Sequence, residues 1–139
     1  MEQKNLYIPG DLVKYNNDLG KVTEIGTSDW YDGAYTCKLR FFSSHNYFTV
    51  GQCDIEPIPL TPEILEANGW EFTECHRDED GFEWYVFSND RVSLDLHYYP
   101  QCKGFSVFAC GEEILPGIKY LHQLQHLLFG LGLESNMIV

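Results

Sequence analysis

Apolar and polar residues alternate in short runs over the first 58 positions of the chain. In the longest run, residues 34–42, Cys37 and Leu39 share one face of an expected strand while Lys38 and Arg40 share the other. Further strands are expected at residues 12–15, 21–25, 47–50 and 53–58. Five short strands divided by turn residues within so short a stretch favour a small β-barrel.

The segment GDLVKYNNDLGKVTEIG, residues 10–26, opens this region. It resembles the first hairpin of SH3-like barrels of the KOW and Tudor type. In those barrels a Gly-Asp pair leads one strand and a glycine in the turn precedes the next. The resemblance implies an SH3-like barrel over residues 1–58, but no particular function, because such barrels serve many binding roles.

A different pattern follows the proline-rich junction at residues 57–60. Thr61 and Pro62 suit the N-cap and the first position of a short helix, and Gly69 suits its end. Four strand-like runs with short connections then predict an antiparallel meander, at residues 70–73, 82–87, 91–98 and 105–110. In residues 118–131 the apolar positions fall on one arc of a helix, which we expect to cover the buried face of that sheet.

These patterns together predict an α+β fold with two domains. The first is an SH3-like small β-barrel over residues 1–58. The second, over residues 59–139, is an α+β subdomain with a short helix, a four-stranded antiparallel meander and a C-terminal amphipathic helix. No apolar run approaches the roughly 18–20 residues of a membrane helix, and no apolar signal core follows the N-terminus, so we expect a cytoplasmic protein without a membrane partner.

Charge narrows the range of partners. The 139 residues include 9 Lys+Arg and 21 Asp+Glu, which gives a formal net charge of -12. Binding to nucleic acid needs a basic footprint, so this charge argues against direct nucleic-acid binding. The acids gather in residues 61–100, and Asp78, Glu79 and Asp80 occupy a turn there. This excess serves solubility, or it forms a surface that meets a basic partner or imitates nucleic acid.

The residues that could bind metal do not form a known pattern. The five cysteines include no C-x-x-C pair, so neither a zinc ribbon nor a dense disulfide framework is indicated. His122 and His126 share a helix face, but Gln123 stands where a zinc protease has glutamate. The acids at 78–80 are contiguous, whereas a calcium loop alternates its ligands. We therefore predict no metal and no cofactor.

Catalytic patterns are equally weak. Ser93, Asp95 and His97 are the residue types of a hydrolytic triad, at every second position of an expected strand. Such neighbours lie about 6.5–7 Å apart, and a working triad needs contacts of about 2.6–3.2 Å. We predict a protein that is not an enzyme, with an enzyme of unrecognised type left as an alternative.

An aromatic group offers one binding hypothesis. Trp30, Tyr31 and Tyr35 lie in or beside the long loop expected at residues 26–33. Such rings either bind a ligand at the rim of a barrel or plug the barrel end. Both interpretations stay open.

Three segments resemble one family over nearly the whole chain: IPLTPEILEANGWEF, WYVF and IKYLHQLQHLLFGL. They are similar to uncharacterised small proteins of Bacteroidetes genomes, their phages and mobile elements. That family has no known activity and implies no catalytic residue. His122, Gln123 and Gln125 match its helix motif and become candidate partner-binding positions, unless the two glutamines cap backbone groups instead.

The function that these observations favour is a non-catalytic, cytoplasmic binding protein of bacterial or phage origin. Its expected partner is a protein or a small ligand. The alternative is an acidic inhibitor that imitates nucleic acid and occupies a basic partner.

Overall fold

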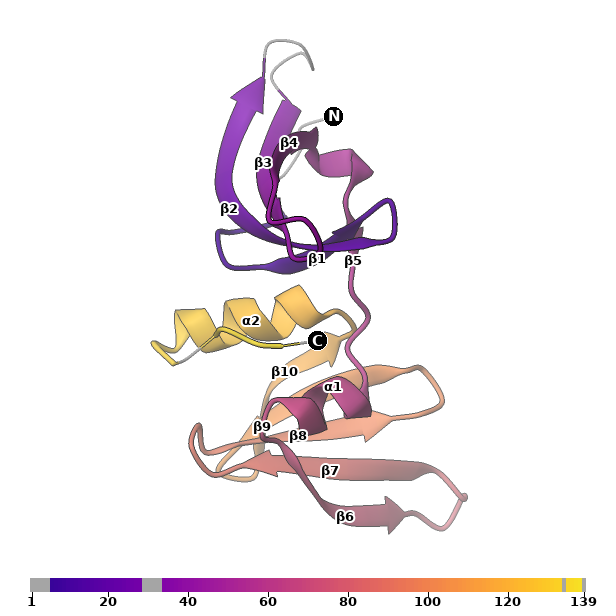
Figure 1. The fold of residues 1–139 in the computed structure, drawn as a ribbon. Coiled ribbons are helices and arrows are strands. Elements are labelled where there is room, and N and C mark those ends of the chain that lie inside the picture. Colours follow the sequence, from indigo (N-terminus) through magenta and orange to yellow (C-terminus); the bar gives the residue numbers. More distant parts are fainter. Residues whose placement is uncertain (1–5, 29–33, 134, 139) are drawn as a thin grey trace. The chain divides into compact units, whose positions relative to one another are not determined.

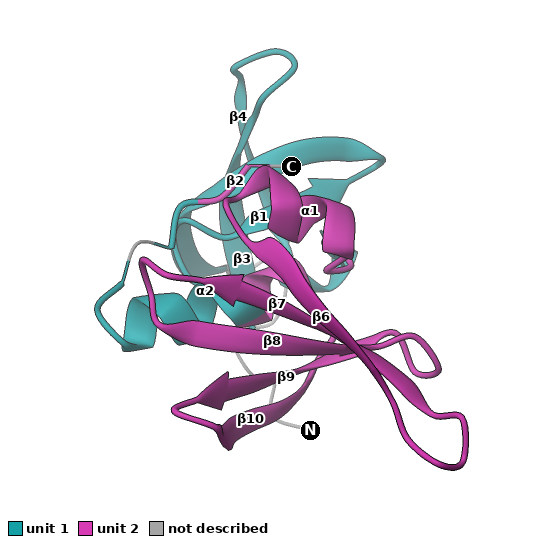
Figure 2. Cartoon of the chain, turned by 90° about the horizontal axis from the view of Figure 1, so that it is seen from below, with its two compact units in different colours: residues 1–58, 124–136 teal, residues 59–123, 137–139 magenta. Residues whose placement is uncertain are grey.

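The computed structural model describes residues 6–28, 34–133 and 135–138 of the chain (Figure 1). The chain forms two compact units, coloured separately in Figure 2. Unit 1 comprises residues 1–58 and 124–136, and unit 2 comprises residues 59–123 and 137–139. The domains predicted from the sequence, 1–58 and 59–139, differ from these units in residues 124–136. Neither helix that the structure describes has the length and apolar character needed to cross a bilayer.

Unit 1 contains an open, five-stranded antiparallel sheet. Its strands are β1 (Leu12–Tyr15), β2 (Asp18–Ser28), β3 (Ala34–Phe41), β4 (Tyr47–Gly51) and β5 (Glu56–Pro57). They follow the order β4-β3-β2-β1-β5, so β4 and β5 are the edges. The strand expected at 53–58 is wrong in part, because a 3-10 helix, Gln52–Asp54, precedes a strand of only two residues.

The turn between β1 and β2 explains why two asparagines stand at this point in the sequence. Asn16 and Asn17 have φ values of 49° and 65°, in the left-handed region. Tyr15 pairs with Asp18 across them, which makes a two-residue hairpin turn. Asparagine tolerates this backbone better than most residues and favours such turns. Pairing therefore starts directly after Asn17.

The core of unit 1 comes from one face of this sheet. Val13, Val22, Cys37 and Leu39 are almost completely buried, and each lies on the same side of its strand. This confirms the alternation predicted for residues 34–42. The opposite side of β3 carries Lys38 and Arg40, as the same alternation requires.

Unit 2 begins with helix α1 (Pro62–Ala67). The Thr61 hydroxyl accepts a hydrogen bond from the Ile64 N–H at 3.3 Å, which satisfies one of the unpaired donors of the first turn. Gly69 follows the helix with φ of 86°, a conformation that costs glycine little. The helix therefore starts and ends where Thr61, Pro62 and Gly69 predicted.

The sheet of unit 2 has five antiparallel strands, so the predicted four-stranded meander is wrong by one strand. They are β6 (Glu71–Arg77), β7 (Glu83–Asn89), β8 (Leu94–Tyr99), β9 (Gly104–Ala109) and β10 (Glu112–Ile118), in the order β10-β9-β8-β7-β6. Strand β10 lacks apolar alternation and contains Pro116. Its pairing with β9 shifts register on both sides of Leu115. Proline and irregular pairing are tolerated at an edge, which is why the pattern concealed this strand.

One face of this sheet is buried and the other is more exposed. Leu94 and Leu96 on β8 are buried, as are Phe105 and Val107 on β9. His97 and its neighbours point to the opposite side. Helix α2 (Leu121–Gly130) begins three residues later than the predicted 118–131, because Ile118 still belongs to β10.

Burial makes Cys37 the unreactive thiol of the five. Burial, together with the nearby Asp11 carboxylate, raises the pKa of Cys37 to about 11, whereas Cys53, Cys75, Cys102 and Cys110 are exposed. Only the thiolate reacts. A thiol reagent at pH 8 should therefore modify four cysteines quickly in the native protein and the fifth only in denaturant. A Cys37→Ser variant should keep the four cysteines that react quickly and lose the one that reacts only in denaturant. Rapid reaction of all five cysteines in the native wild type would contradict the burial of Cys37.

Candidate functional site

The candidate residues of the helix motif at 118–131 make contacts within the protein. The Gln125 side chain is buried, and its Oε1 accepts the Leu12 N–H at 3.0 Å. Its Nε2 donates to the carbonyl oxygens of Gly10 at 3.0 Å and Ser135 at 3.1 Å. Gln125 thus satisfies backbone groups at the start of β1 and leaves no amide atom for a ligand.

Gln123 has a comparable role at the start of α2. Its Oε1 accepts the N–H groups of Lys119 at 2.8 Å and Tyr120 at 3.0 Å, which caps the helix. His122 is 9% exposed, and its ring stacks on that of Tyr120 with centroids 6.0 Å apart. The two glutamines therefore take the backbone-capping role that the sequence left open.

His126, one turn after His122, pairs with a carboxylate. Its Nε2 lies 2.7 Å from Oδ2 of Asp11, which is only 1% exposed. The same oxygen accepts the Ile8 N–H at 2.9 Å. Asp11 directly precedes β1, so the Asp11–His126 pair fixes the entry to that strand.

The three carboxylates of the acidic turn, residues 78–80, have different roles. Asp78 Oδ1 accepts the N–H groups of Asp80 at 3.0 Å and Phe82 at 2.9 Å, and Gly81 completes the turn with φ of 80°. Asp78 therefore closes the β6–β7 turn. The side chains of Glu79 and Asp80 extend from it into solvent.

Of the predicted aromatic group, the structure describes Tyr35. Trp30 and Tyr31 lie outside the described residues. Tyr35 is half-buried near the start of β3, where it pairs with Thr27 of β2.

A ring-rich face of the second sheet was not predicted from the sequence. On the exposed side of β6–β9, the His76 and Trp84 rings stack with centroids 5.2 Å apart, and those of His97 and Phe108 with centroids 3.9 Å apart. The ring centroids of Trp84 and of Phe82, which lies at the acidic turn, are 6.3 Å apart. The strand register brings these rings together from four strands, which no local sequence pattern could show.

Carboxylates surround these rings. Glu74, Asp95 and Glu113 lie on the same side of the sheet, and all three act electrostatically on His97. Of the strand residues that the structure describes on this side, none is Lys or Arg. We call this surface the acidic face; it comprises His76, Trp84, His97, Phe108, Glu74, Asp95, Glu113 and the turn residues 78–82.

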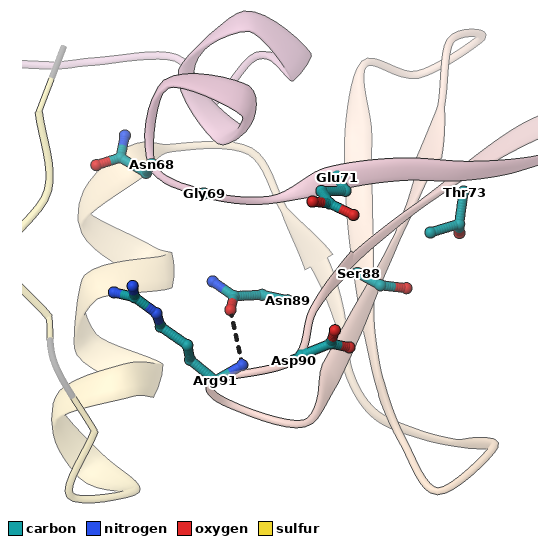
Figure 3. Close-up of a pocket in the computed structure, with 8 residues that line it drawn as sticks. All are labelled: Asn68, Gly69, Glu71, Thr73, Ser88, Asn89, Asp90 and Arg91. Carbon is teal, nitrogen blue, oxygen red and sulfur yellow. Dashed lines mark hydrogen bonds between the residues drawn. The ribbon is translucent and has the colours of Figure 1, made fainter.

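A polar cavity of about 610 Å³ lies beside the acidic face (Figure 3). It is lined by Asn68, Gly69, Glu71, Thr73, Ser88, Asn89, Asp90 and Arg91. Several of these side chains already bond within the protein. Asn68 bonds both backbone polar groups of Ile138, Ser88 donates to Asp95 at 2.6 Å, and Asn89 accepts the Arg91 N–H at 3.0 Å. What the cavity presents to solvent is chiefly the charge of Glu71, Asp90 and Arg91.

Unit 1 has a smaller pocket with aromatic walls, of about 360 Å³. Tyr15, Phe41 and Phe48 contribute rings, with centroids 6.2 Å apart for Tyr15 and Phe41 and 5.7 Å for Phe41 and Phe48. Val50 adds an apolar side chain, and polar groups come from Asn16, Asp18, Ser44 and Thr49. No local sequence pattern indicates this pocket, because its walls come from four strands and two turns.

The geometry does not assemble a hydrolytic triad. Ser93 lies in the turn before β8 with φ of 54°, so its predicted place on the strand is wrong. Asp95 accepts a hydrogen bond from Ser88, and the His97 ring stacks on Phe108. In the part of the chain that the structure describes, no three His, Cys, Asp or Glu side chains are grouped to hold a metal ion.

Replacing the buried Gln125 amide should destabilise the protein. In a Gln125→Leu variant the Leu12 N–H and Gly10 C=O lose their partner while remaining out of water. We expect a loss of about 1–3 kcal/mol in the free energy of unfolding, measured by urea denaturation at pH 7. The control Gln101→Leu, in an exposed turn, should be close to wild type. Equal stability of the two variants would contradict the structural role.

His97 should make the protein less stable in mild acid. Burial lowers the pKa of His97 below 6.5, and His76 also lowers it. Asp95, Glu113 and Glu74 raise it, but the pKa remains lowered overall. As the pH falls below 6.5 the unfolded chain therefore binds the proton more readily than the folded one, so stability falls. Between pH 7.5 and pH 5.5, the urea midpoint of unfolding should decrease more for the wild type than for the His97→Gln variant. An equal decrease in both would contradict this assignment.

Comparison with models of known families, with curated proteins and with solved structures finds no match for this chain.

Proposed function

We propose that this chain is a non-catalytic binding protein whose acidic face docks a basic region of a partner protein. The observation that carries the proposal is the juxtaposition of exposed carboxylates with aromatic rings on one side of β6–β10. Each kind of group suits a cationic partner for its own physical reason.

The first reason is the local charge. Residues 71–83 contain six carboxylates against one guanidinium, and that guanidinium, Arg77, is paired with Glu83. A concentrated negative field attracts a basic surface and speeds its approach. Since the carboxylates of Glu79 and Asp80 point into solvent, they can meet the partner without breaking the turn that Asp78 closes.

The second reason is the rings. Arginine and lysine side chains bind favourably over aromatic faces, most strongly over tryptophan. Trp84 and Phe82 stand beside the acidic turn, and Phe82 is 39% exposed. A partner arginine at this place can stack on a ring and pair with a carboxylate at the same time.

Nucleic-acid mimicry is the narrower form of the same proposal. The carboxylates would then occupy a site that normally holds phosphates. Competition decides between the two forms, because duplex DNA should displace the protein from a partner that it captures by mimicry. A partner that does not bind DNA would leave the general proposal intact.

Unit 1 fits a binding role as well. The strand order β4-β3-β2-β1-β5, with a 3-10 helix directly before β5, supports the assignment of an SH3-like barrel. We retain the bacterial or phage origin, the cytoplasmic location and the family resemblance as proposals that rest on the sequence motifs.

Capture from a bacterial lysate, at about 0.1 M and about 1 M salt, tests the proposal. The screening length falls from about 10 Å to about 3 Å between these conditions, so a partner held by charge should be retained only at low salt. A variant with Glu79→Lys and Asp80→Lys should capture about tenfold less of the partner than the wild type does. Asp78 is kept because it closes the turn.

The matched control changes the net charge equally at another exposed place, with Asp54→Lys and Glu56→Lys in unit 1. It should capture the partner as the wild type does. Phe82→Ala should weaken capture without changing its salt dependence. Equal losses in both charge-reversed variants, or capture that ignores salt, would contradict docking at the acidic face.

A further inference from the structure

Strand β4 differs from the other sheet edges in having no protection against strand pairing. Natural edges usually carry charged residues or proline, which discourage another chain from adding to the sheet. Of the four edge strands that the structure describes, β5 has Glu56 and Pro57, β6 has charged residues, and β10 has acids and Pro116. β4, with the sequence YFTVG, has neither.

The side chains of β4 are also unusually apolar for their exposure. Tyr47 and Phe48 are 53% and 55% exposed. Among the described residues, β3 is the only strand paired with β4. Residues 47–49 of this edge are exposed, so an extended peptide can approach the strand there.

The core side of β4 forms one wall of the aromatic pocket of unit 1. Phe48 pairs with Leu39, so it is on the core side of the sheet, and it forms a wall of the pocket with Phe41 and Tyr15. Successive residues of a strand point to opposite faces. The side chains of an added strand that point to the core side would therefore lie next to Phe48, at the rim of this pocket, which suits leucine or phenylalanine.

The other side of the added strand would meet basic groups. Arg40 and Lys38 pair with Tyr47 and Thr49 across β3 and β4, and both lie on the face opposite the core. Lys38 Nζ lies 5.4 Å from the ring centroid of Tyr47, a residue of β4, so the ammonium group lies near this edge strand. Strands are spaced about 4.8 Å apart, which puts an added strand about 10 Å from β3, within reach of these long side chains.

We propose that β4 is a docking edge for an extended segment of another protein, in which apolar and acidic residues alternate. The segment adds as a sixth strand, its apolar side chains lie at the rim of the aromatic pocket, and its acidic side chains face Lys38 and Arg40. This site lies in unit 1 and does not depend on the acidic face.

Three synthetic peptides test the proposal. The first is acetylated Thr-Glu-Leu-Glu-Phe-Glu-Thr, which alternates. The second, Thr-Glu-Glu-Leu-Phe-Glu-Thr, has the same composition without the alternation. The third is the first peptide with its backbone amides N-methylated, so that it cannot donate along the edge. Binding is followed by NMR shifts of the protein's backbone amides and by fluorescence anisotropy of labelled peptide.

The alternating peptide should bind and shift the amides of β4 and of the pocket residues. The other two should bind at least about tenfold more weakly, because one misplaces the side chains and the other lacks the main-chain hydrogen bonds. Phe48→Ala and Arg40→Glu should each weaken binding of the alternating peptide about fivefold. Both positions are exposed, and melting curves verify that the variants remain folded.

Matched controls remove the same kinds of side chain elsewhere. Phe129→Ala, at a position on α2 that is 64% exposed, and Arg91→Glu, in the β7–β8 turn, should bind as the wild type does. Equal binding of the alternating and rearranged peptides, shifts outside β4 and the pocket, or no binding at millimolar peptide would overturn the proposal. Self-association that Phe48→Ala abolishes would also overturn it, by assigning the edge to a second copy of this chain.

Discussion

The buried amide of Gln125 is the contact on which the start of the first sheet depends. The backbone around Gly10 and Leu12 enters the unit away from water, where an unpaired N–H or C=O costs as much as a lost hydrogen bond. Gln125, more than one hundred residues later, supplies a partner to each and also holds Ser135. The Asp11–His126 pair adds a second link between the same two segments. This requirement explains why residues 124–136 belong to unit 1.

The same contacts show what the glutamines of the helix motif at 118–131 do in the folded protein. Glutamine at positions 123 and 125 is suited to caps and clamps because one amide both donates and accepts. The side chains that most resembled a functional signature therefore stabilise the backbone, and the surfaces open to partners lie on the sheets. Those surfaces have opposite character, since the second sheet exposes carboxylates beside rings while the outer side of β3 exposes Lys38 and Arg40.

Local signals predicted the elements that depend on local physics. The α1 cap, the alternation in β3 and β8, and the antiparallel connections of the second half follow from residue type and short spacing. Errors occurred where tertiary context replaced such signals. Edge strand β10 has no alternation to detect, and residues 52–54 form a 3-10 helix within an expected strand. Ser93, which was expected on a strand, lies in a turn with a positive φ.

The charge, the α+β character and the position of most strands could be predicted from the residues alone, because they follow from composition and from periods of two and 3.6 residues. Which side chains meet depends on how the strands pair. Strand register assembles the acidic face from His76, Trp84, His97 and Phe108, and it lines the aromatic pocket with Tyr15, Phe41 and Phe48. Register depends on pairing between distant segments, so no window along the chain contains that information.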